Sequence, residues 1–340
     1  MALSFFFALK LLRIVFFTLQ TILTRIYNIM KRERLQNLLV LCYNFSMKNY
    51  VLANEYFTSV FGCKTYKIAL DGGMSCPNRD KNGKGGCIFC SEGGSGDFAE
   101  KPCGDINTQI ERAIGRIKSK KAQKFIAYYQ SYTNTYAPIS YLKSVFLPAI
   151  NHPLVCALSI ATRPDCIDDD VLALLRELNQ IKPVFVELGL QTANDEIAKL
   201  INRGYQTQTY LDSVKKLKSI GINVITHVII GLLNETDSDL LNTIKVVNES
   251  GSDGIKLQLL HVLKNTALER LFTKGEYLPL EKDEYIRLLI LCLKNLRNGM
   301  VVHRITGDAP KRILVAPTWS ADKKRVLNDI HKAIDDAYKN

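Results

Sequence analysis

Three cysteines lie close together in one segment of the sequence. Cys76, Cys87 and Cys90 belong to the run CPNRDKNGKGGCIFC, which has neither helical nor strand periodicity. Thiolates are the preferred ligands of iron-sulfur clusters, and glycines let backbone N–H groups turn toward the anionic sulfurs. Three thiolates would leave one iron of a 4Fe-4S cluster open, as in a catalytic metal site. A zinc site completed by Cys103 or Cys63 is an open alternative.

Polar side chains also interrupt the apolar runs farther along the chain. Arg163 and Asp165 follow one run, Glu187 lies inside VFVELGL with Gln191 after it, and His227 interrupts another run. A buried charge costs several kcal/mol unless it is paired or hydrogen-bonded. We therefore expect Glu187 to have either a ligand or a structural salt bridge with Arg163. His227 is expected to be a core histidine or a substrate contact.

Short β-branched runs alternate with helical stretches from residue 64 onward. Strands are expected over 64–70, 125–129, 154–160, 184–190, 223–230 and 254–260, and helices over 106–118, 168–178, 210–220 and 237–249. This βα alternation suits a doubly wound sheet or a barrel. The unusual residues follow the strands, which favours an α/β fold with a partial or complete (β/α) barrel over 47–275. Residues 276–340 are expected to form a C-terminal helical extension, with a short strand near Val301, packed on the barrel.

The composition is that of a folded enzyme in a reducing compartment. Apolar residues make up 47% and charged residues 23% of the chain, which argues against a disordered or fibrous protein. Nine cysteines without a small disulfide scaffold favour the cytoplasm. The net charge of +12 suits a polyanionic partner such as RNA.

The first 46 residues form a hydrophobic, basic leader. Lys10 and Arg13 interrupt its apolar stretch, so stable membrane insertion is not expected. Met30 and Met47 are both possible starts, and all motifs with apparent chemistry follow Met47. The leader is therefore interpreted as an extension outside the mature fold; the alternative is a basic amphipathic helix that lies flat on an anionic membrane surface.

Several motifs in order resemble the radical SAM superfamily, and more closely its YhcC/YtqA-like branch, which groups with the catalytic subunit of Elongator. The match spans about residues 56–337 and rests on these motifs: CPNRD, CIFC, GSGDFA, YYQSYTNTYAP, SIATRPD, VELGLQT, INRG, HVIIGL, HVLKNT and RITGDAPKRILVAPTWS. The long spacer between Cys76 and Cys87 departs from the commonest superfamily pattern and is similar to that of the Elongator-like enzymes.

The resemblance implies a role for each candidate residue. Cys76, Cys87 and Cys90 would bind the 4Fe-4S cluster, and S-adenosylmethionine (SAM) would chelate its open iron. Phe89 would meet the adenine. The positions corresponding to contacts with the methionine amino group are Gln130, Ser131 and Thr133, where the usual glycines are missing. Arg163 and Glu187 would contact the cofactor and, with Gln191, take part in catalysis.

The resemblance also implies an oxygen-sensitive enzyme. A one-electron donor such as flavodoxin or ferredoxin would reduce the cluster, and SAM would be cleaved to methionine and a 5'-deoxyadenosyl radical. The expected substrate is tRNA, at C5 of the wobble uridine. The alternatives are a small-molecule cofactor precursor and a non-catalytic, zinc-stabilised RNA-binding module.

Two further groups of residues have both a structural and an RNA-binding interpretation. Aromatic side chains near strand ends either stack on a base or belong to the core; they are Tyr128, Tyr129, Tyr132 and Tyr136. A basic group near the C-terminus contacts RNA or is a solvated helix face; it consists of Trp319, Lys323, Lys324 and Arg325.

Overall fold

The computed structural model describes residues 48–80, 82–94, 96–100, 105–117 and 123–339. The leader predicted over residues 1–46 and the possible zinc ligand Cys103 lie outside these ranges. Within them, no helix is both long and apolar enough to cross a membrane.

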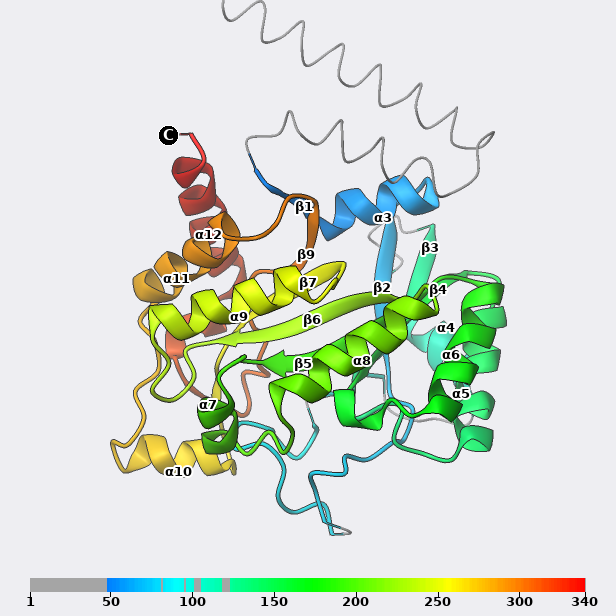
Figure 1. The fold of residues 1–340 in the computed structure, drawn as a ribbon, viewed down its shortest axis with the longest axis horizontal. Coiled ribbons are helices and arrows are strands. Elements are labelled where there is room, and N and C mark those ends of the chain that lie inside the picture. The colour runs from blue at the N-terminus through cyan, green and yellow to red at the C-terminus, as the bar shows by residue number, and fades with distance from the viewer. Residues whose placement is uncertain (1–47, 81, 95, 101–104, 118–122, 340) are drawn as a thin grey trace, which may run out of the picture.

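Eight parallel strands form a curved, open sheet (Figure 1). Its strands are β1 (Tyr50–Leu52), β2 (Thr65–Leu70), β3 (Lys124–Tyr129), β4 (Val155–Thr162), β5 (Val184–Gln191), β6 (Asn223–Ile230), β7 (Gly254–Leu259) and β9 (Met300–Arg304). The order across the sheet is β1-β9-β7-β6-β5-β4-β3-β2. Consecutive strands from β2 to β7 lie side by side and do not reverse order as in a doubly wound sheet. The prediction of a partial (β/α) barrel is confirmed.

Helices connect the strands, and most of them cover the outer face of the sheet (Figure 1). They are α3 (Ala53–Phe61), α4 (Ile106–Gly115), α5 (Ile139–Asn151), α6 (Asp169–Ile181), α7 (Asp195–Leu200), α8 (Thr207–Ser219), α9 (Asp237–Glu249), α10 (Ala267–Thr273), α11 (Lys282–Lys294) and α12 (Lys323–Ala337). The side chains of Asp105, Asp168 and Thr236 cap the first turns of α4, α6 and α9, which satisfies backbone N–H groups that have no helical partner. The four predicted helices are confirmed as α4, α6, α8 and α9.

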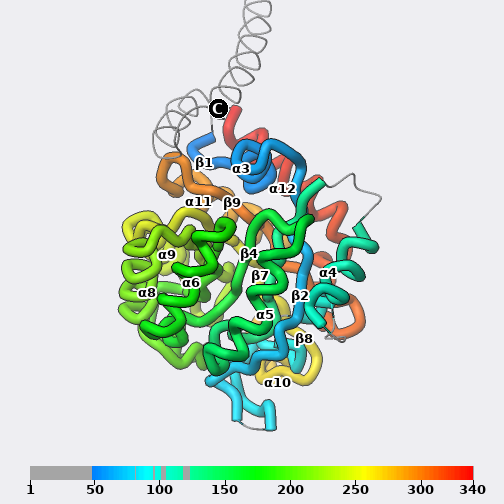
Figure 2. Tube along the Cα trace, turned by 90° about the vertical axis from the view of Figure 1, so that its right-hand side faces the viewer, coloured from blue at the N-terminus to red at the C-terminus, as the bar shows by residue number. Residues whose placement is uncertain are grey.

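The two ends of the strands differ in what covers them. The cysteine segment, α7 and α10 gather at the carboxyl ends, while α3 lies at the amino ends (Figures 1 and 2). Phe57 of α3 packs edge-on against Phe185 of β5, with ring centroids 5.5 Å apart, in a cluster that includes Ile126 and Ile225. Aromatic packing therefore closes the amino end, and we call the carboxyl end the mouth of the barrel.

The C-terminal segment does more than pack on the barrel. Its strand β9 lies between β1 and β7 and pairs with both in parallel. Strands β8 (Val262–Leu263) and β10 (Leu314–Ala316) form a separate antiparallel pair just beyond the end of β7. Two short 3-10 turns complete the described elements, η2 (Pro164–Cys166) and η3 (Thr318–Ala321). Residues 276–339 thus help to build the sheet and its mouth.

Candidate active site

The cysteine loop (residues 71–100) follows β2 and is held in shape by its own polar groups. Arg79 donates through Nη1 to the carbonyl oxygen of Gly83 (3.0 Å) and through Nη2 to that of Ser91 (2.6 Å). The Asp80 carboxylate accepts two backbone N–H bonds within the same turn, at 2.9 and 2.8 Å. These bonds fix the long spacer between the first two cysteines.

The loop is also bound to the turn between α7 and α8. Asn78 Nδ2 donates to the carbonyl oxygen of Asn202 (2.7 Å), and Asn202 Nδ2 donates to that of Gly86 (2.7 Å). Gly204 has a φ of +85°, and a Cβ there would lie 2.9 Å from Asn78 Oδ1 and 3.3 Å from Arg163 Nη2. These contacts explain the INRG motif. Its Asn202 hydrogen-bonds the cysteine loop, and its Gly204 lets that loop pack closely against the turn.

The surroundings of Cys87 favour negative charge on its sulfur. Asn78 Nδ2 lies 3.7 Å from Cys87 Sγ. A hydrogen bond from the Cys90 thiol outweighs burial and, with the charge of Arg163, lowers the pKa of Cys87 to about 7. The same bond raises the pKa of its donor, Cys90. Such surroundings suit thiolate ligands.

Arg163 lies at the mouth and binds Asp165. Its Nε and Nη2 donate to the two carboxylate oxygens at 2.9 and 2.7 Å, and its Nη1 donates to the carbonyl oxygen of Arg203 at 2.9 Å. The salt bridge considered between Arg163 and Glu187 does not form. Glu187 is level with Ala161 in the sheet, so it lies deeper in the barrel than Arg163.

Glu187 instead lies in a buried cluster of charges at the centre of the barrel. Lys67 of β2 and Lys256 of β7 form ion pairs with its carboxylate. Ser159 Oγ donates to Oε1 at 2.6 Å, and His227 Nε2 is 2.6 Å from Oε2. The Glu187 side chain has no exposed surface. Glu187 therefore has the charged partners that its burial requires. They are two lysines from strands on opposite sides of the barrel.

The charges in this cluster shift one another's protonation. Burial alone would raise the pKa of Glu187, but Lys256 and Lys67 outweigh it and hold the pKa well below its usual value. Burial lowers the pKa of Lys256 to about 7 and that of His227 to about 4. His227 is therefore neutral at pH 7 and still donates through Nε2–H to the carboxylate.

The segment after β3 lies against the cysteine loop. The backbone N–H of Thr133 donates to the carbonyl oxygen of Ser75 at 3.1 Å. Ser131 Oγ is buried and has no hydrogen-bond partner among the residues that the structure describes. Gln130 is half-buried at the end of β3. Burying a hydroxyl without a partner is costly, which makes Ser131 a group ready to receive a ligand.

Phe89 lies in the cysteine loop and Gln191 at the end of β5, both at the mouth of the barrel. Phe89 packs on a separate apolar cluster that includes Ile201 and Leu268. Gln191 has a φ of +60°, and its Oε1 accepts from the Tyr205 hydroxyl at 3.1 Å. A positive φ is strained for a residue with a side chain, and such strain clusters at functional sites.

Sequence reasoning missed Lys67, Lys256 and Arg203. The first two lie in the apolar runs TYKIAL and GIKLQL, and the argument applied to Glu187 would have found them. Arg203 is fully buried and donates to the carbonyl oxygens of Leu190 and Thr192 at 2.7 and 2.6 Å. It therefore holds the end of β5, next to Gln191.

The tyrosines divide between the core and the site. Tyr129 is a core residue whose hydroxyl donates to the carbonyl oxygen of Val145 at 3.0 Å. Tyr128 belongs to the charged cluster, since Lys256 Nζ donates to its hydroxyl at 3.0 Å. Tyr132 lies at the loop, with Arg79 over its ring at 5.3 Å, and Tyr136 is 47% exposed.

Comparison with known proteins bears directly on this site. The sequence model of the radical SAM superfamily matches residues 76–247, and that of the radical SAM C-terminal domain matches residues 252–336. This chain belongs to the radical SAM superfamily. Together the two matches cover the cysteine loop, the barrel strands from β3 onward and the C-terminal segment.

Relatives place this radical SAM protein in the YhcC/YtqA-like branch. It is 42% identical over 295 residues to the uncharacterized protein YtqA of Bacillus subtilis, covering 86% of this chain and 92% of that protein. It is 34% identical over 268 residues to protein YhcC of Escherichia coli, covering 78% and 86%. The archaeal Methanocaldococcus infernus Elp3 has a similar fold, with a TM-score of 0.60 and 19% identity over 79% of this chain and 63% of that one.

Radical SAM enzymes use a 4Fe-4S cluster and SAM, and the donor set here fits both. Three free thiols lie on one loop. In the described ranges, no three His, Cys, Asp or Glu side chains surround a single-ion position. Cys63 precedes β2 whereas Cys76 follows it, so the two lie at opposite ends of the barrel. The superfamily match favours a catalytic cluster site over a non-catalytic zinc module, while Cys103, the other possible zinc ligand, lies outside the described residues.

Proposed function

We propose that this radical SAM enzyme modifies tRNA, at the C5 substituent of the wobble uridine. The observation that carries the proposal is its relationship to tRNA-modifying proteins. The chain is 27% identical over 163 residues, 47% of its length, to the tRNA uridine(34) acetyltransferase of Methanocaldococcus infernus. It is 24% identical over 208 residues to archaeosine synthase subunit beta of Methanosarcina acetivorans.

We assign the cluster ligands to Cys76, Cys87 and Cys90. The cluster and SAM, when bound, supply a one-electron cleavage that yields methionine and a 5'-deoxyadenosyl radical. The chain contributes positive charge beside the sulfurs, since Arg163 lies close enough to Cys87 to lower its pKa. Cations near an anionic cluster stabilise it and raise its reduction potential.

The SAM-binding residues in this proposal come from the cysteine loop and from the strands around it. They are Phe89 in the loop, Gln130, Ser131 and Thr133 after β3, Arg163 after β4 and Glu187 within β5; Gln191, at the end of β5, is proposed to take part in catalysis with Arg163 and Glu187. None of the described residues hydrogen-bonds Ser131 Oγ, so this hydroxyl can bind a ligand. Their role is to orient the nucleoside so that its reactive carbon is close to the target C–H bond.

The buried cluster around Glu187 suits a polar substrate. Two lysines and a neutral histidine surround one carboxylate, although apolar residues would fill this part of the barrel at lower cost. Strongly shifted pKa values of this kind cluster at functional sites. Lys67 and His227 keep partly exposed side chains in this cluster, and a pyrimidine ring offers carbonyl acceptors for the lysine and an N–H donor for the second ring nitrogen of the histidine.

The external partners follow from the same proposal. A one-electron donor such as flavodoxin or ferredoxin would approach the cysteine loop, where Lys84 is exposed. The excess positive charge of +12 would favour tRNA binding. A tRNA substrate would place the reaction in the cytoplasm.

The test compares tRNA nucleosides by mass spectrometry in a strain lacking the gene and in complemented strains. We expect one modified wobble uridine to disappear, to return with the wild-type gene and with Cys63→Ala, and not to return with Cys76→Ala. An unchanged nucleoside profile would refute tRNA as substrate and favour the small-molecule precursor.

A further inference from the structure

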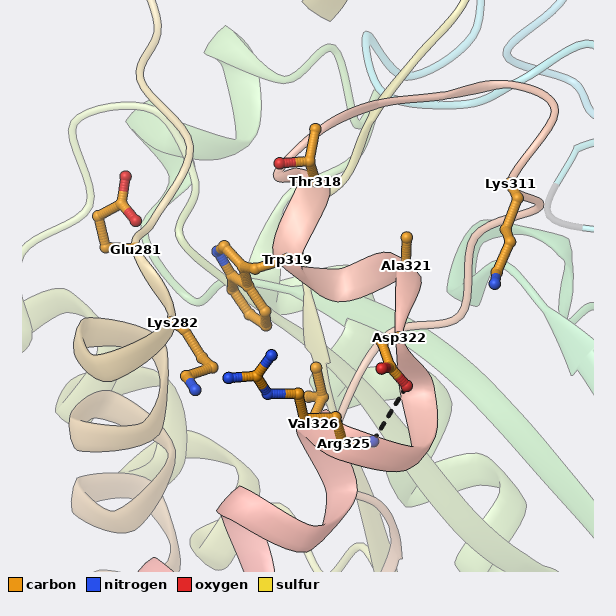
Figure 3. Close-up of a pocket in the computed structure, with 9 residues that line it drawn as sticks. All are labelled: Glu281, Lys282, Lys311, Thr318, Trp319, Ala321, Asp322, Arg325 and Val326. Carbon is orange, nitrogen blue, oxygen red and sulfur yellow. Dashed lines mark hydrogen bonds between the residues drawn. The ribbon is translucent and has the colours of Figure 1, made fainter.

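A cavity of about 600 Å³ lies between α11, η3 and the start of α12, outside the barrel (Figure 3). Trp319, Lys311 and Arg325 line it, together with Lys282, Glu281 and Asp322. None of these residues takes part in the site described above. The cavity therefore requires an explanation of its own.

The cavity is connected to the mouth through the segment that follows β9. This segment begins at the carboxyl end of β9. The carbonyl oxygen of its Ile313 accepts a hydrogen bond from the backbone N–H of Lys264, just beyond β7, at 2.8 Å. Arg312, next to Lys311, forms an ion pair with Asp97 of the cysteine loop at 3.2 Å. Lys311 of the cavity is therefore the chain neighbour of a residue that contacts the cysteine loop.

Trp319 presents a fixed aromatic surface. Its indole Nε1–H donates to the carbonyl oxygen of Leu280 at 3.0 Å, and its ring centroid is 5.9 Å from that of Tyr285. The rest of the half-buried ring borders the cavity (Figure 3). A ring whose position is already fixed loses little entropy when a ligand stacks on it.

Two cations of the cavity remain available. Lys282 is paired with Asp329 at 2.6 Å, and Asp322 caps α12 by accepting from the backbone N–H of Arg325 at 3.2 Å. In the part of the chain that the structure describes, Lys311 has no ion pair, and the Arg325 guanidinium interacts with the Asp329 carboxylate electrostatically but is not hydrogen-bonded to it. Neighbouring Lys323, by contrast, is paired with Asp308.

We infer that this cavity binds one nucleotide of the tRNA, outside the base being modified, with the base stacked on Trp319 and a phosphate on Lys311 and Arg325. The inference rests on the proposed tRNA substrate. Unpaired RNA bases are recognised by stacking on aromatic rings and by hydrogen bonds to their edges, and the carboxylate of Glu281 can accept from a base amino group. A bare phosphate would gain nothing from the ring.

The test uses the fact that Trp319 is the sole tryptophan of the sequence. The anaerobic holoenzyme is titrated with an anticodon stem-loop RNA, and tryptophan fluorescence is followed together with RNA anisotropy. We expect the fluorescence to be quenched in parallel with binding, because a stacked base quenches indole emission. Trp319→Leu should weaken binding about tenfold, within the range for loss of one stacked base.

Charge variants keep the test independent of the tryptophan. Lys311→Glu/Arg325→Glu should weaken binding at least tenfold and make the salt dependence shallower by about 0.7 for each phosphate that the protein no longer neutralises. The control, Lys245→Glu/Lys332→Glu, makes the same change in net charge at exposed positions outside the cavity. It should change binding much less.

The outcomes separate this inference from the proposed function. If RNA binds without quenching and the two charge variants behave alike, the cavity is not a nucleotide site, while tRNA remains the proposed substrate. If RNA does not bind even at low salt, both proposals are overturned.

Discussion

Replacing Glu187 by glutamine should destabilise the protein severely although the two side chains have nearly the same shape. The wild-type carboxylate is completely buried and pairs with Lys67 and Lys256. Glutamine removes the negative charge and places an NH₂ group close to the ammonium groups. Two cations in the barrel would then lack their counter-charge.

The magnitude follows from the contacts. Removing one partner of a buried ion pair lowers the free energy of unfolding by about 3–5 kcal/mol. The pKa of Lys256 is already lowered to about 7, so in the variant this lysine can lose its proton at little further cost. Lys67 keeps partial access to water, with a side chain that is 21% exposed. We therefore expect the lower part of the range, about 3 kcal/mol, out of a total stability of about 5–15 kcal/mol.

The assay is urea unfolding of cluster-free protein with reduced thiols at pH 6, below the pKa of Lys256 so that both lysines are charged, followed by circular dichroism. The matched control is the double variant Glu187→Gln/Lys256→Met, which removes both charges at similar volume. We expect the double variant to be at least as stable as the single one. A loss below about 1 kcal/mol for Glu187→Gln, or a double variant whose loss equals the sum of both single losses, would refute the buried-charge reasoning.

Three further predictions concern the loop and the cluster. Gly204→Ala should lower iron content and the absorbance of the reconstituted cluster, because its Cβ would lie 2.9 Å from Asn78 Oδ1 at a φ of +85°; normal loading would contradict the docking role of INRG. Cys76→Ala should abolish iron loading and 5'-deoxyadenosine formation, whereas Cys63→Ala should leave both near wild type; equal losses would argue against the ligand assignment. Lys256 has a folded pKa of about 7 against about 10.4 when unfolded, so the unfolded state binds more protons between these values and stability rises with pH. Wild type should therefore gain about 2 kcal/mol over Lys256→Met from pH 7 to pH 9 in urea unfolding; a constant difference would mean that Lys256 does not titrate there.

The sequence predicted the central strands and the cysteine loop because both carry strong local signals. The run Val184–Gln191 is buried over most of its length, and continuous apolar runs of this kind are typical of parallel strands. Strands β1, β8 and β10 were missed because they have only three, two and three residues. Such elements are too short to show a period of two, and their neighbours in the fold determine them.

The partners of Glu187 could not be predicted, for a different reason. Its need for a counter-charge followed from burial alone, but Lys67 and Lys256 lie on strands that meet it only across the curved sheet. Arg163 is nearer in sequence, yet it follows its strand and lies at the mouth with Asp165. Local chemistry thus indicates which residue needs a partner, while the closure of the sheet decides which partner it finds.

The pairing of β1 with β9 has a consequence for how the protein is made. Tyr50 is level with Met300 in the sheet, so two strands separated by most of the polypeptide become neighbours. Contacts between residues so distant in sequence slow folding, because the chain loses loop-closure entropy before the contact stabilises it. During synthesis β1 and the free edge of β7 therefore lack their neighbour until residue 304 has left the ribosome. We expect the nascent barrel to depend on chaperones over that interval, and the cluster to be inserted only afterwards.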